Sequence, residues 1–431
     1  MSLTKTVGFF AGTTLAIGGV AFGADQTNDF AAEIAGLKAQ IAEMKNAQGD
    51  AWLTEQRASE IRGIVTDVLA DAETRSSLQG SGAGAGYDNG FFLSSADGNY
   101  SMKINVLQQI RFAYADEDAG EAWGFENKRT RLTFSGNMVD SSWSYKVGYY
   151  LGYSNSAEDF GAGELADANV SKDFGNGFAM TVGQFKLPFG AEYGLDSGNT
   201  QFMEYSVIST AFGPGFGQGL MFSYSADMFR VMAAYVNGEN EVNQAWGPGA
   251  PKSDFTGAAR AEFKFAGNWA QFNDGMSFRG EEFGAMLGAG VLYSSNESDG
   301  LGGSADVFKL TVDATVDFGG GNLAAALYWV DVDGANSNPW GFTVGGGFFV
   351  SDEIELVARW ESFDDDAGTD INTLTVGGNW YLAKNTAKFQ ADFGYAFDAL
   401  TLPGGLIANN NWVPSTDDGE WVIRGQLSFS F

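Results

Sequence analysis

From Phe91 to the C-terminus, apolar and polar residues alternate along the chain with a period of two. In residues 101–115 (SMKINVLQQIRFAYA), apolar side chains such as Met102 and Ile104 point to one face, and polar ones such as Lys103 and Arg111 point to the other. Side chains alternate in this way across a β-strand, so each such segment is predicted to be a strand with one apolar and one polar face.

Sixteen segments of this kind are predicted. They start near residues 101, 129, 143, 164, 178, 219, 229, 256, 283, 306, 322, 341, 354, 372, 386 and 421. Short connections such as 174–177 alternate with long ones such as 188–218, which is typical of outer-membrane barrels. The connection 266–282 is longer than this alternation predicts, and a miscounted strand there is the alternative.

The fold class predicted for residues 91–431 is all-β, a 16-stranded antiparallel transmembrane β-barrel. The competing interpretation is a soluble β-sandwich. The last segment, WVIRGQLSFSF, favours the barrel because a final alternating strand ending on an aromatic residue, here Phe431, resembles the assembly signal of outer-membrane proteins.

The first 90 residues have a different pattern. Residues 1–23 carry Lys5, an apolar run and a small-x-small site, which predict a cleaved signal peptide rather than a membrane anchor. Residues 24–79 place apolar side chains at heptad-like spacing, so we expect a helical segment, either a periplasmic coiled coil or an amphipathic helix packed on another surface. Residues 80–90 (GSGAGAGYDNG) are predicted to be a Gly-rich linker.

Composition narrows the chemistry. The chain has 60 Gly and 36 Phe but no Cys and no His, which excludes thiol nucleophiles, Ser-His-Asp triads and imidazole metal sites. The net charge of −30 argues against a nucleic-acid partner. Downstream of residue 23 no run of about 18 apolar residues occurs, so only a closed barrel would cross a bilayer.

The basic and acidic side chains are distributed unevenly between the two faces of the predicted strands. Twelve of the 18 basic residues in the barrel fall on the polar, lumen-facing side: Lys103, Arg111, Arg129, Arg131, Lys146, Arg230, Arg260, Lys264, Lys309, Arg359, Lys388 and Arg424. About eight acids share that side, and the others crowd the loops. We therefore expect a mildly basic lumen beneath an acidic vestibule. The alternative is that these bases pair with acids and leave ion selectivity weak.

The segment 178–219 is the most unusual connection. It starts as a strand, breaks at Pro188 and continues as a long Gly-rich loop before the next strand. Its charged residues are Lys186, Glu192, Asp196 and Glu204. Long loops in regular arrays are usually functional, so we expect this one to fold into the barrel and narrow a pore. Lys186 is expected to pair with Glu192 or Glu204 and fix the loop.

Two motifs imitate other chemistry. GPGFGQG near residue 213 lacks the strand–helix context of a nucleotide loop. Asp364–Asp366 with Asp370 lacks the Glu of an EF-hand, since Thr375 holds the twelfth position. No catalytic residue, metal site or cofactor is predicted, and no enzyme activity is expected.

Two segments carry a family resemblance. GQFKLPFGAEYG, followed by QFMEYSVISTAFGPG, resembles the corresponding blocks of the phosphate-selective porins O and P, and further strands in residues 90–431 are similar in order. The resemblance implies an outer-membrane location in a Gram-negative-type bacterium, a homotrimer in outer-membrane lipid, and a third outer loop folded into each pore. In characterised members the lumen is lined by Arg and Lys and draws anions.

The chain departs from the family pattern at one place. Between Lys186 and Arg230 it has no Lys or Arg, whereas a phosphate site needs a dense basic cluster. The predicted function is passive diffusion of small hydrophilic solutes and ions, with a mild anion preference. The alternatives are a phosphate or polyphosphate channel and a structural barrel that tethers the envelope.

Overall fold

The computed structural model describes residues 35–40, 42–43, 84–117, 120–153, 164–240, 242–243, 253–298, 304–335, 337–401, 407 and 410–431. The chain divides into two compact units, Met1–Gly86 and Tyr87–Phe431. In the first unit, residues 35–40 and 42–43 are helical, but the described residues give no support for a coiled coil. The predicted signal peptide and most of the segment 24–79 lie outside the described residues. None of the described helices is both long and apolar enough to cross a membrane.

Two short strands precede the barrel. β1 (Gly84–Tyr87) falls in the range predicted as a linker, and β2 is Phe91–Ser94. In the described part of the second unit, sixteen further strands follow. They are β3 (Ser101–Glu117), β4 (Gly120–Met138), β5 (Asp140–Tyr153), β6 (Glu164–Gly175), β7 (Phe178–Lys186), β8 (Phe216–Ser225), β9 (Phe229–Val236), β10 (Phe255–Ala266), β11 (Gly284–Ser298), β12 (Ser304–Asp317), β13 (Gly321–Val332), β14 (Trp340–Phe349), β15 (Ile354–Asp364), β16 (Asp370–Ala383), β17 (Ala387–Ala396) and β18 (Trp421–Ser430).

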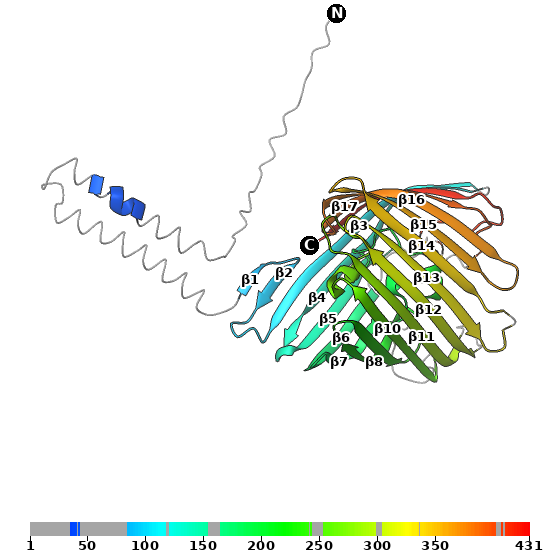
Figure 1. The fold of residues 1–431 in the computed structure, drawn as a ribbon, viewed down its shortest axis with the longest axis horizontal. Helices are drawn as coiled ribbons and strands as arrows, with labels where there is room; N and C mark the ends of the chain where they lie inside the picture. Colours follow the sequence, from blue (N-terminus) through cyan, green and yellow to red (C-terminus); the bar gives the residue numbers. More distant parts are fainter. Residues whose placement is uncertain are drawn as a thin grey trace, which may run out of the picture. The chain divides into compact units, whose positions relative to one another are not determined.

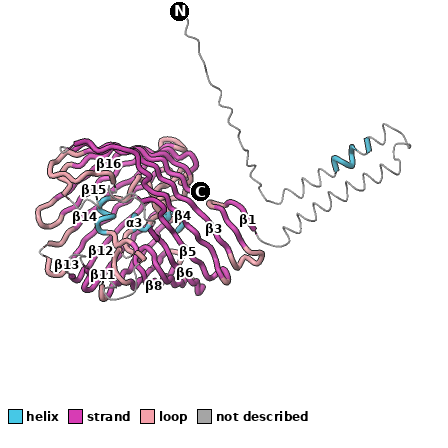
Figure 2. Tube along the Cα trace, turned by 180° about the vertical axis from the view of Figure 1, so that it is seen from behind, coloured by secondary structure: helices cyan, strands magenta, loops and turns pink. Residues whose placement is uncertain are grey.

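The sixteen strands close into one antiparallel barrel, which confirms the predicted fold class (Figures 1 and 2). Each strand pairs with the next, and β18 returns to β3, with Trp421 opposite Asp116 and Ser430 opposite Leu107. The start of β3 pairs instead with β2, where Phe91 lies opposite Ile104. β2 therefore continues along β3 beyond the end of β18 and covers an edge that would otherwise be unpaired.

Burial in the barrel is the reverse of that in a soluble protein. In β15 the side chains alternate, with Leu356 55% exposed on the outer face and Glu355 fully buried on the inner face. The same alternation gives exposed Leu310 and buried Asp313 in β12. Exposed aliphatic and aromatic side chains around a closed barrel require an apolar solvent, so the outer wall fits a bilayer.

The structure corrects two details of the strand prediction. β4 starts at Gly120 rather than near residue 129, because a register shift opposite Gln109 and Ile110 breaks the alternation that marks a strand in the sequence. The connection 266–282 is not a miscounted strand. It contains a 3-10 helix, η1 (Trp269–Asn273), which starts with a capping box made by Asn268 and Gln271.

Candidate functional site

The long connection between β7 and β8, residues 187–215, crosses the interior of the barrel and is called the inward loop below. It contains two short helices, α3 (Ala191–Gly194) and α4 (Val207–Phe212). The Ser206 hydroxyl caps α4 by accepting from the Ser209 amide. The Phe212 ring stacks on Tyr328 of β13, with ring centroids 5.6 Å apart, and lies 5.9 Å from Phe363 of β15. Apolar packing thus holds α4 against the wall.

Glu204 fixes the middle of the inward loop to the opposite wall. Its carboxylate accepts from the Arg111 guanidinium of β3 at 2.6 Å and from both terminal nitrogens of Arg129 of β4 at 2.7 Å. All three side chains are buried. Such a buried bidentate pair with a further charged donor defines one position for the loop.

Three other charged groups fix the N-terminal part of the same loop. Asp196 binds Arg131 of β4 at 2.5 Å, and Glu192 binds Arg359 of β15 at 3.2 Å. Lys186 donates to the carbonyls of Tyr193 and Leu195 and to the Tyr205 hydroxyl, at 2.8 to 3.1 Å. The expected pairing of Lys186 with Glu192 or Glu204 is therefore wrong, because those acids are taken by arginines of the wall.

Glycines in the barrel wall allow the inward loop to approach the strands closely. A Cβ on Gly290 of β11 would lie 2.4 Å from the Phe189 carbonyl oxygen. A Cβ on Gly347 of β14 would lie 2.4 Å from the side-chain nitrogen of Gln201. Both positions carry the lumen-facing parity, so the wall is locally smooth where the loop contacts it.

A second segment enters the barrel from the opposite end. The connection between β10 and β11, residues 267–283, is called the long turn below. The Gly275 amide donates to the Asn199 carbonyl of the inward loop at 2.9 Å, and Asn322 of β13 donates to the Gly275 carbonyl at 2.8 Å. Met276 and Phe278 are buried in an apolar cluster against the barrel wall. The long turn therefore supports the inward loop from the opposite end of the barrel.

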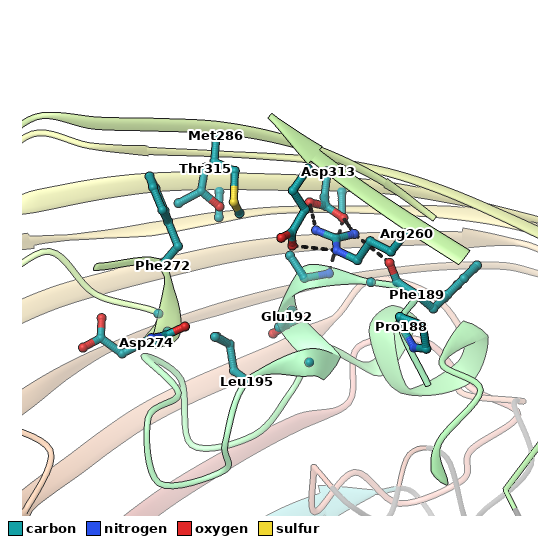
Figure 3. Close-up of a pocket in the computed structure, with 18 of the residues that line it drawn as sticks. Pro188, Phe189, Glu192, Leu195, Arg260, Phe272, Asp274, Met286, Asp313 and Thr315 are labelled. Atoms are coloured by element: carbon teal, nitrogen blue, oxygen red, sulfur yellow. Dashed lines mark hydrogen bonds and ion pairs between the residues drawn. The ribbon is translucent and has the colours of Figure 1, made fainter. Parts of the chain in front are cut away.

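Between the inward loop and the wall of β8–β14 lies a cavity of about 690 Å³. Figure 3 shows it with Leu195 and Glu192 on the loop side, Met286 and Thr315 on the strand side, and Phe272 of the long turn beside them. The inward loop is bound to β3 and β4 through Glu204 and Asp196, and the cavity lies on its other side.

Charge in the cavity is nearly balanced. Among the described residues its lining has four basic side chains, Lys186, Arg230, Arg260 and Arg359, and five acidic ones, Glu192, Asp196, Glu262, Asp274 and Asp313. Arg260 holds Asp313 at 2.6 Å (Figure 3). Arg260 also holds Glu262 at 2.8 Å, and Glu262 binds Arg230 as well. The paired groups give the lining little net charge.

The other basic residues proposed from the sequence lie outside the cavity. Arg111, Arg129 and Arg131 stand behind the inward loop, bound to its acids. Elsewhere on the wall, Lys103 lies 3.9 Å from Asp88, Lys146 lies 2.9 Å from Asp167, Lys264 lies 3.7 Å from Asp227, Arg424 lies 2.7 Å from Asp392, and Lys309 binds Glu239. Lys388 instead donates to the Thr200 carbonyl of the inward loop at 2.7 Å.

Asp274 differs from the other acids of the lining. No Lys or Arg of the described residues forms an ion pair with it, and its carboxylate accepts from the Asn385 side chain at 3.3 Å. Burial raises the pKa of Asp274 to about 7, and the negative charges of Glu281 and Asp317 act in the same direction. No sequence pattern marked this group, because it lies in the connection 266–282, for which no functional role was predicted.

Comparison with known proteins places this geometry in a family. Residues 102–298 match the family model of the phosphate-selective porins O and P. The chain is a porin. The match confirms the resemblance carried by the GQFKLPFGAEYG block, which forms the end of β7 and the start of the inward loop in this porin. No curated protein matches the chain.

Solved structures support the fold of the porin. An anion-selective porin from Comamonas acidovorans is 16% identical with a TM-score of 0.56, covering 77% of this chain and 99% of that one. OmpF of Salmonella typhi, in a complex with daunomycin, is 12% identical with a TM-score of 0.53, covering 81% and 100%. In-vitro folded OmpT of Vibrio cholerae is 16% identical with a TM-score of 0.52, covering 80% and 98%.

Proposed function

We propose that this outer-membrane porin is a passive diffusion channel for small hydrophilic solutes and ions, with weak ion selectivity. The observation that carries the proposal is the cavity between the inward loop and β8–β14, whose basic and acidic side chains nearly cancel. Ion preference in a narrow lumen follows the local charge, so a balanced lining discriminates little between anions and cations.

The same geometry argues against a phosphate channel. A phosphate site requires several guanidinium or ammonium groups free to donate to one anion. Arg111 and Arg129 already donate to Glu204, and Arg131 donates to Asp196. Within the cavity, Arg260 donates to Asp313, Glu262 and the Phe189 carbonyl. The mild anion preference expected from the wall residues is therefore not part of this proposal, which predicts weak selectivity between anions and cations.

We also propose that the porin works as a homotrimer in outer-membrane lipid, with one pore per chain. The proposal rests on the family match and on the apolar outer wall, which offers surface both to lipid and to neighbouring barrels. Mild cross-linking of the purified porin in detergent should give a ladder that ends at three subunits. A ladder ending at one or two would refute the trimer.

Liposome swelling with the purified full-length porin tests the channel. Small sugars and amino acids should enter at rates that fall with solute size, whereas a plugged structural barrel would admit none. Ala324→Trp on the lumen side of β13 should slow entry. Leu323→Trp, its neighbour on the outward face of the same strand and outside the cavity lining, is the matched control and should leave the rate unchanged. Equal rates for both variants would show that the cavity is not the passage.

A further inference from the structure

The cavity has an apolar side that a general pore does not need. We propose that its constriction favours amphiphilic solutes, namely small zwitterionic molecules with a compact uncharged apolar side chain, over polar molecules of the same size. This inference rests on the proposed function, since it names the class of solute that passes through the same cavity.

The apolar side is built from residues of separate elements. Met221 of β8, Met232 of β9 and Met286 of β11 line the wall, with Ala324 and Ala326 of β13 beside them. From the other side, Leu195 of the inward loop and Phe272 of the long turn complete the lining, as Figure 3 shows for Leu195, Phe272 and Met286. Methionine side chains are flexible and polarizable, so they accommodate apolar groups of varied shape.

Apart from Asp274, the charged groups of the cavity are held by partners and are not free to bind a solute tightly. The three protons of the Lys186 ammonium have three oxygen partners, and its charge also lies 5.0 to 5.1 Å from the centres of the Tyr193 and Tyr205 rings. The Arg359 guanidinium binds Glu361 and Glu192, and its flat side covers the Phe202 ring at 4.5 Å. A strongly hydrated ion therefore finds few groups to replace its water.

A zwitterion meets a more favourable lining. Its ammonium and carboxylate are attracted weakly to opposite ends of the fixed pairs, such as Asp313 and Arg260, without breaking them. The Ser223 and Thr315 hydroxyls lie among the methionines and offer single hydrogen bonds. The apolar side chain of the solute contacts Met221 and Met232, and each methylene removed from water favours partition into the cavity by up to about fourfold.

The test compares solutes matched in size. Methionine and glutamine have side chains of similar length, and both are zwitterions without net charge. We expect liposomes carrying the native porin to admit methionine at least twofold faster than glutamine. A Met221→Gln and Met232→Gln double variant should abolish or reverse that ratio. Met228→Gln, an exposed methionine in the turn between β8 and β9, is the control and should keep the native ratio.

The outcomes separate this inference from the proposed function. Entry of both amino acids with glutamine equal to or faster than methionine would overturn the solute preference and leave the diffusion channel intact. Entry of neither amino acid, together with no conductance in planar bilayers, would overturn both. If the Met221→Gln and Met232→Gln double variant is shown by circular dichroism to be folded and still keeps the native methionine-to-glutamine ratio, the role of the methionines is refuted.

Discussion

Glu204 is the residue whose removal most directly perturbs the constriction. Its side chain is 2% exposed and lies between Arg111 and Arg129, which are 0% and 4% exposed. Glu204→Gln keeps the shape of the side chain but removes its charge, so two buried guanidinium groups lose their common partner. Breaking a buried ion pair by removing one partner costs about 3–5 kcal/mol, and the amide oxygen that remains should keep the cost at about 3 kcal/mol.

That cost acts on the docking of the inward loop. A loss of about 3 kcal/mol raises the population of the undocked loop by roughly a hundredfold, at about 1.4 kcal/mol for each factor of ten. Single-channel recordings should show more frequent transitions between conductance levels. The lumen also gains one positive charge, so the reversal potential in a KCl gradient should shift toward chloride selectivity.

Glu282→Gln is the matched control, because Glu282 is an exposed acid in the long turn. Glu282→Gln should change neither the frequency of transitions between conductance levels nor the reversal potential. The reasoning would be refuted if Glu204→Gln also left both quantities at their native values while the protein still folded, since the buried acid would then contribute nothing to loop position or lumen charge.

Three further perturbations have defined outcomes. Asp274→Asn should raise the melting temperature in detergent at pH 8 but not at pH 4. The native carboxyl keeps its proton up to about pH 7, so the wild type loses stability as the pH rises from about 4 to about 7, and the uncharged Asn avoids that loss. An equal effect at both pH values would contradict this. Gly290→Val should displace the Phe189 carbonyl and increase single-channel conductance, because the new Cβ would lie 2.4 Å from that oxygen; an unchanged conductance would mean that the loop is not held there. Lys186→Met should lower the free energy of unfolding by about 1–3 kcal/mol, measured by denaturant titration, since it leaves the Tyr193 and Leu195 carbonyls without their donor; a stable variant would show that water replaces it.

The strands of this barrel were predictable because their signal is local. A lipid-facing strand must alternate between apolar and polar side chains over its whole length, and the pattern in residues 101–115 shows this without any knowledge of the neighbours. The signal failed in β4, where one register shift moves the alternation out of phase. It also failed in the long turn, whose apolar residues Met276 and Phe278 have no regular spacing and pack against strands far along the chain.

The strand face on which each charged side chain lies was predictable from the sequence, but its ion-pair partner was not. Parity placed Arg111 and Arg260 in the lumen, where the structure has them. Whether such an arginine attracts solute depends on the acid that meets it, and Glu204 is 93 residues away from Arg111 along the chain. No local pattern specifies that contact, because the path of the inward loop decides it.

The described lining of the cavity has nearly balanced charge, so the pore should select only weakly between ions. The reversal potential of the native porin in a KCl gradient across a planar bilayer tests this most directly. At pH 8, with Asp274 ionised, we expect a potential close to zero with a slight shift toward potassium. A potential close to the Nernst potential of chloride, or a current blocked by inorganic phosphate, would contradict it.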